Sequence, residues 1–102
     1  MNGTGPNPNI LANITLYKTD QGGRKGPTPK DFFTCVLDFN GEKFSCRMYL
    51  YQIGSISPGD TVEVPITFTC PELILNRLKI GNKFKIWDGG FKGEGEVLKI
   101  LT

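Results

Sequence analysis

Few residues of this 102-residue chain could carry out chemistry, and the most versatile type is missing. The sequence has no histidine, the commonest general base and the partner of serine and cysteine nucleophiles in catalytic triads. It has three cysteines, an odd number that argues against a disulfide framework, and no Cys-x-x-Cys spacing for a zinc site. We therefore expect no metal site, no cofactor and no enzymatic activity.

Two further patterns resemble catalytic or nucleotide-binding motifs without completing them. Residues 54–61, Gly-Ser-Ile-Ser-Pro-Gly-Asp-Thr, have the glycine spacing of a phosphate loop, but Asp60 occupies the position of the phosphate-binding lysine. Pro58 also removes a backbone N–H donor. Glu94 and Glu96 share one face of a predicted strand, which is typical of a solvated surface rather than of a glycosidase cleft. We expect neither motif to be a site.

The arrangement that does suggest a function combines aromatic rings with arginine. Phe32, Arg47, Tyr49 and Tyr51 are predicted to point outward from one hairpin. Aromatic side chains and arginine are enriched in protein interfaces, and stacking rings beside positive charge also suit single-stranded nucleic acid. A third interpretation is that these rings are simply packed against their neighbours on a twisted sheet.

The hairpin that positions these residues is the clearest local prediction. Asn40-Gly41 separates two runs of alternating apolar residues, and this dipeptide favours the type I′ turn, which needs positive φ at both central residues. A two-residue turn pairs Asp38 with Lys43 and Cys35 with Cys46. The Cα atoms of such a cysteine pair are about 5.5 Å apart, within reach of a disulfide. We expect reduced thiols packed in the core, because cysteine is among the most buried residue types.

Composition indicates an all-β chain. It has one alanine against nine isoleucines, four valines and nine threonines, and about a fifth of the residues are glycine or proline. Six short strands are expected, within residues 10–17, 32–39, 42–51, 61–69, 83–87 and 91–101. Closure into an antiparallel barrel is favoured because it hides the sheet edges. Gly93 and Gly95 are expected where the barrel bends sharply.

The expected organisation is a flexible lead over residues 1–9 and one barrel domain over residues 10–102. No apolar run approaches the roughly 18 residues of a membrane helix, and the sequence does not open with a signal-peptide pattern. We therefore expect a cytoplasmic location. The net charge of +2 is divided unevenly, since residues 18–30 and 77–99 are each basic and residues 31–76 are acidic. The two basic segments could form one patch.

Several short blocks, taken in order, carry a family resemblance. They are Thr19-Asp20-Gln21-Gly22-Gly23-Arg24-Lys25, Ser57-Pro58-Gly59-Asp60, residues 83–90 with the sequence Lys-Phe-Lys-Ile-Trp-Asp-Gly-Gly, and Gly93-x-Gly95. Over about residues 11–101 the chain resembles the C-terminal β-barrel domain of bacterial elongation factor Tu, here as a stand-alone protein. The resemblance implies a closed six-stranded antiparallel barrel. In that family the barrel is not catalytic, and it helps to hold the T-stem backbone of aminoacyl-tRNA.

Two functions follow as expectations. The first is contact with tRNA, other RNA or components of the translation apparatus, with phosphates bound by Arg24, Lys25, Lys83, Lys85 and Lys92. The second is a protein-interaction module, such as a factor mimic, an inhibitor or an immunity-type protein. Its contact surface would consist of Phe32, Arg47, Tyr49, Tyr51 and Trp87.

Overall fold

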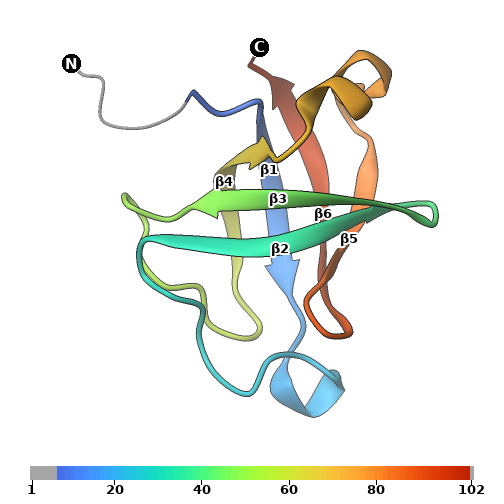
Figure 1. The fold of residues 1–102 in the computed structure, drawn as a ribbon. Helices are drawn as coiled ribbons and strands as arrows, with labels where there is room; N and C mark the ends of the chain where they lie inside the picture. The colour runs from blue at the N-terminus through green and yellow to red at the C-terminus, as the bar shows by residue number, and fades with distance from the viewer. Residues whose placement is uncertain (1–6, 102) are drawn as a thin grey trace.

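Six antiparallel strands close on themselves to form a barrel in the computed structural model of the protein, which describes residues 7–101 (Figure 1). The strands are β1 (Ile10–Leu16), β2 (Phe32–Phe39), β3 (Glu42–Tyr49), β4 (Thr61–Phe68), β5 (Lys83–Trp87) and β6 (Phe91–Ile100). Three short 3-10 helices connect them: η1 (Thr19–Gln21), η2 (Pro71–Leu73) and η3 (Leu75–Arg77). The prediction of an all-β, six-stranded closed barrel is confirmed.

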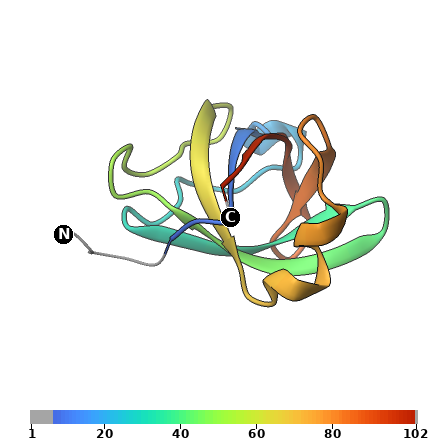
Figure 2. The same ribbon diagram turned by 90° about the horizontal axis from the view of Figure 1, so that it is seen from above.

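The strands follow one another around the barrel in the order β1-β4-β3-β2-β5-β6. The β2–β3 hairpin crosses the other strands steeply (Figure 1), and seen from above it runs along one side of the barrel (Figure 2). It joins its neighbours through short seams, because β3 pairs with β4 over only Cys46–Met48 and β2 pairs with β5 over only Val36–Asp38. Most of the length of the hairpin is therefore not paired with the neighbouring strands β4 and β5.

The turn of this hairpin forms as the Asn-Gly dipeptide predicts. Asn40 and Gly41 have φ values of 56° and 95°, as a type I′ turn requires. The carboxylate of Asp38 accepts a hydrogen bond of 2.6 Å from the Gly41 N–H and so stabilises the turn. The register is the predicted one, with Asp38 opposite Lys43 and Cys35 opposite Cys46.

The core is formed by every second residue of the strands, the one whose side chain points into the barrel. Among the residues that are essentially inaccessible to solvent are Leu16, Leu37, Met48, Ile66, Phe68 and Ile86. Cys35 and Cys46 belong to this core as free thiols, as predicted, and their Sγ atoms are 3.7 Å apart. The hydrogen bond to Cys35 and burial together raise the pKa of Cys46 well above its usual value, so this thiol stays protonated.

Two glycines of β6 allow the barrel to close tightly. A Cβ atom on Gly95 would lie 2.6 Å from the ring of Phe84 on β5 and 2.7 Å from the carbonyl oxygen of Asn13 on β1. A Cβ atom on Gly93 would lie 2.5 Å from the carbonyl oxygen of Thr15. These positions therefore admit only glycine.

The barrel begins earlier than the sequence suggested. Asn9, expected in the flexible lead, is buried: its N–H donates to the Ile66 carbonyl and its side-chain oxygen accepts from the Phe68 N–H. The Leu101 N–H donates to the Asn9 carbonyl. Asn9 thus satisfies backbone groups at the end of β4 and beside β6, which a polar residue does better than an apolar one. Residues 1–6 of the expected lead lie outside the described residues.

No helix in the described part of the chain is both long enough and apolar enough to span a membrane.

Candidate functional site

The outer face of the β2–β3 hairpin carries an exposed group of aromatic rings around one arginine. We call Phe32, Arg47, Tyr49 and Tyr51 the Arg47 cluster. The Arg47 guanidinium lies over the Phe32 ring, 4.4 Å from its centroid, and Phe32 is the cross-strand partner of Tyr49. The rings of Tyr49 and Tyr51 are stacked, with centroids 6.1 Å apart. The structure thus brings four of the five predicted interface residues together.

Two of the three rings of the cluster are exposed to solvent, and the third, that of Tyr49, is half-buried. Tyr51 is 64% exposed and Phe32 is 38% exposed. Ile53, which the sequence analysis did not select, is 45% exposed in the turn that follows β3. That turn is fixed by hydrogen bonds from the Ile53 and Gly54 N–H groups to the Leu50 carbonyl. Ile53 has no alternating pattern around it, so nothing in the sequence indicated which way it points.

Arg47 differs from the other arginines in having no acidic partner. Arg24 forms a salt bridge of 2.7 Å with Asp88, and Arg77 forms one of 3.1 Å with Glu42. Within residues 7–101, Arg47 takes part in no ion pair and donates no hydrogen bond from its guanidinium. Its cross-strand neighbours, Thr34 on β2 and Thr67 on β4, are uncharged.

Trp87, the fifth predicted interface residue, belongs to a different group. It contacts Phe91 edge to face, with centroids 5.1 Å apart, and the ammonium of Lys43 lies 5.6 Å from its ring centroid. Its partner on β2 is Val36, four residues from Phe32 and so about 13 Å along the strand. Trp87 therefore lies apart from the other four predicted interface residues, because the order of the strands, and not the hairpin, decides what lies beside it.

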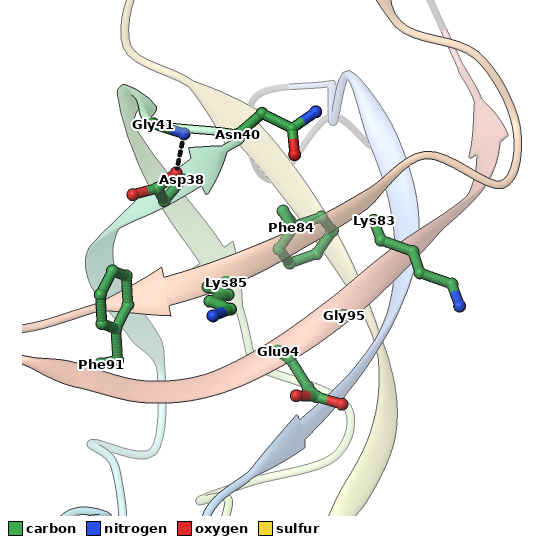
Figure 3. Close-up of a pocket in the computed structure, with 9 residues that line it drawn as sticks. All are labelled: Asp38, Asn40, Gly41, Lys83, Phe84, Lys85, Phe91, Glu94 and Gly95. Atoms are coloured by element: carbon green, nitrogen blue, oxygen red, sulfur yellow. Dashed lines mark hydrogen bonds between the residues drawn. The ribbon is translucent and has the colours of Figure 1, made fainter.

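A shallow pocket of about 460 Å³ adjoins the group around Trp87 (Figure 3). It is lined by Asp38, Asn40, Gly41, Lys83, Phe84, Lys85, Phe91, Glu94 and Gly95. Its charges alternate: Lys85 stands opposite Asp38 on β2 and Glu94 on β6, and Lys83 stands opposite Glu96. The Gly41 N–H first, and then Lys43 and Lys85, lower the pKa of Asp38 below its usual value, so the carboxylate remains charged. The lysines at this pocket already face carboxylates of the chain, so the pocket does not favour the binding of a phosphate.

The five candidate phosphate-binding residues do not lie together: they are spread along the barrel, with Lys85 in the middle of β5. Arg24 and Lys25 lie in the loop after η1, and Lys92 follows the β5–β6 turn; the Arg24–Asp88 salt bridge joins these two segments. Lys83 begins β5, at the other end of that strand. Arg24 also donates to the carbonyls of Gly26 and Pro27, each at 3.4 Å, so its guanidinium is engaged in holding the loop.

No other chemistry-bearing cluster emerges from the remaining acidic side chains. Glu94 accepts a hydrogen bond of 3.2 Å from the Tyr17 hydroxyl. Partial burial, followed by this contact, raises the pKa of Tyr17. In the part of the chain that the structure describes, no three side chains of His, Cys, Asp or Glu meet in a way that could hold a metal ion.

Comparison with protein-family models and with curated proteins finds no match for this chain.

Proposed function

We propose that this protein is a non-catalytic binding module that recognises another protein through the Arg47 cluster. One observation carries the proposal: the exposed rings of this surface surround an arginine whose charge and hydrogen-bond donors are unused within the described residues. Tyrosine, tryptophan and arginine dominate the residues that contribute most to protein binding.

The hairpin also provides the rigidity that such a surface needs. Phe32, Arg47 and Tyr49 lie on paired strands whose inner faces are packed in the core through Phe33, Cys46 and Met48, and Tyr51 stacks on Tyr49 from the turn after β3. Rings held in this way lose little conformational entropy when a partner docks. Both tyrosines carry a polar hydroxyl at the end of an apolar ring, which suits a surface that is wet when free and covered when bound.

RNA contact, the other function expected from sequence, has weaker support. Lys83 and Lys85 each face a glutamate on β6 across the strand pair, and Arg24 is paired with Asp88. Phosphate binding depends on uncompensated positive charge. The resemblance to the elongation factor barrel supports partners in translation, and within that class the Arg47 cluster favours a protein.

The test compares two exposed side chains in full-length, tagged protein. Tyr51 and Ile80 are 64% and 69% exposed, but only Tyr51 belongs to the cluster. We expect a protein captured from a cell extract by the wild type and by Ile80→Ala to be lost with Tyr51→Ala, and to be retained after nuclease treatment. A captured protein that Tyr51→Ala retains, or that nuclease releases, would overturn the proposal.

A further inference from the structure

Resting on this proposed function, we infer that the partner presents a carboxylate flanked by apolar side chains, and that Arg47 is the residue that selects it. The observation behind this is the contrast between Arg47 and the other outward-facing cations of the neighbouring strands. Lys43 and Lys85 both face Asp38, and Lys83 faces Glu96. Arg47 faces a threonine on either side.

The stacking of Arg47 on Phe32 leaves its hydrogen-bond donors available. A guanidinium over a ring keeps its N–H groups at the edge of its own plane, where they can donate to a carboxylate in a bidentate manner. The Phe32 ring also restricts the position of the guanidinium, so less side-chain entropy is lost when the carboxylate binds. Lysine could not replace arginine in this geometry, because its ammonium neither stacks in a plane nor offers paired donors.

Burial then decides the chemistry of the partner. A protein that covers Phe32, Tyr49 and Tyr51 also removes water from Arg47, and a desolvated cation without an acceptor is strongly unfavourable. Residues 7–101 supply no carboxylate at this position, and a carboxylate on the partner is the acceptor that both takes the hydrogen bonds and neutralises the charge. The rings of Phe32, Tyr49 and Tyr51 favour apolar side chains beside that carboxylate.

The experiment selects binders from a displayed library of random ten-residue peptides on three forms of the full chain. On the wild type we expect enrichment of sequences with Asp or Glu next to Trp, Phe or Leu. On Arg47→Glu we expect acidic residues to be depleted and Lys or Arg to be enriched. Arg47→Gln should weaken a peptide selected on the wild type by at least tenfold, whereas Ile80→Ala should leave its affinity unchanged.

Different results would contradict the protein-binding role of the cluster and the selection of a carboxylate by Arg47. If the selected peptides lose affinity with Tyr51→Ala but show no acidic preference, the inference is overturned and the surface remains a protein-binding site. If neither Tyr51→Ala nor the Arg47 variants alter binding, both are overturned. The inference is also overturned if the wild type selects no acidic sequence. The same holds if a ten-nucleotide RNA displaces the selected peptides and binds the wild type more tightly than any of them. Circular dichroism of each variant establishes that it is folded.

Discussion

Two adjacent phenylalanines on β2 each contact the guanidinium of an arginine, on opposite faces of the same strand. Phe33 points inward and its ring lies 5.0 Å from the guanidinium of Arg24, whereas Phe32 points outward and lies 4.4 Å from that of Arg47. Arg24 is also joined to Asp88 and to two loop carbonyls. Within the described residues, the contact of the Arg47 guanidinium is with the Phe32 ring, and it forms no ion pair.

The difference shows that an arginine on an aromatic ring does not by itself indicate a binding site. Arg24 forms a salt bridge and two further hydrogen bonds within the chain, and these join the segment after η1 to the turn between β5 and β6. Around Arg47 the Phe32 ring positions the charge, but no carboxylate in the described part of the chain neutralises it. The first arrangement stabilises the fold, and the second is suited to recognition.

The largest effect should come from disrupting the loop that carries Arg24. A Cβ atom on Gly23 would collide with the carbonyl oxygens of Tyr17 and Lys18, whereas one on Gly26 would meet no atom within 4 Å. We expect Gly23→Ala to lower the free energy of unfolding by about 3 kcal/mol, because backbone must move to admit it. Gly26→Ala, in the same loop, should change it by less than about 0.5 kcal/mol. Equilibrium denaturation with urea measures both, and equal effects would contradict the packing described here.

The next test exchanges the two arginines for methionine, which keeps an unbranched apolar stem. Arg24→Met should lower the free energy of unfolding by about 2 kcal/mol, because it leaves Asp88 and two carbonyls without their partner. Arg47→Met should lower it by less than about 0.5 kcal/mol, since no ion pair is lost. A larger loss for Arg47→Met than for Arg24→Met, in the same denaturation measurement, would reverse the comparison.

A third, smaller effect concerns Asp38, which binds the Gly41 N–H and pairs with Lys43 at 3.3 Å. Its pKa is lowered in the folded state, so its contribution to stability is complete above the unfolded value of about 3.9 and is lost as the pH falls through the folded value. In Asp38→Asn, stability should therefore decline less between pH 5 and pH 2 than in the wild type. Thermal unfolding at each pH measures this, with exposed Asp20→Asn as the control; identical slopes for wild type and Asp38→Asn would refute the expectation.

The smallest effect should be on the thiols beneath the Arg47 cluster. Cys35 and Cys46 are 5% and 1% exposed, whereas Cys70 is exposed, so a thiol reagent should label one cysteine rapidly and two very slowly in native protein. Arg47→Met should leave these rates unchanged if Arg47 contributes nothing to the packing below it. Mass spectrometry of the labelled chain follows all three sites, and rapid labelling of Cys46 in that variant would show that Arg47 does hold the hairpin.

The sequence predicted the hairpin and its register because Asn40-Gly41 limits the turn to one geometry and the flanking residues alternate. The strands were predicted for the same reason, since a period of two is a local property. The Arg47 cluster followed from these, because cross-strand partners in a hairpin are fixed by the turn.

What the sequence did not predict depends on segments that are far apart along the chain. The partner of Arg24 is Asp88, 64 residues away, so its role in the fold could not be distinguished from phosphate binding. The distance between Trp87 and the Arg47 cluster was not predicted, because no local pattern places β5 beside β2 at Val36. Asn9 seemed to belong to the lead because a polar residue before a strand is ordinary, and its hydrogen bonds to β4 arise only on closure.

That closure also determines how the barrel could be built into larger architectures. Because Asn9 and Leu101 are hydrogen-bonded neighbours, the chain enters β1 and leaves β6 at one end of the barrel, and the start of β1 and the end of β6 lie together at the top of Figure 1. A short linker between Asn9 and Leu101 could give a circular permutant opened at another turn. The barrel could also be inserted into a loop of a host protein without distorting the barrel or the host.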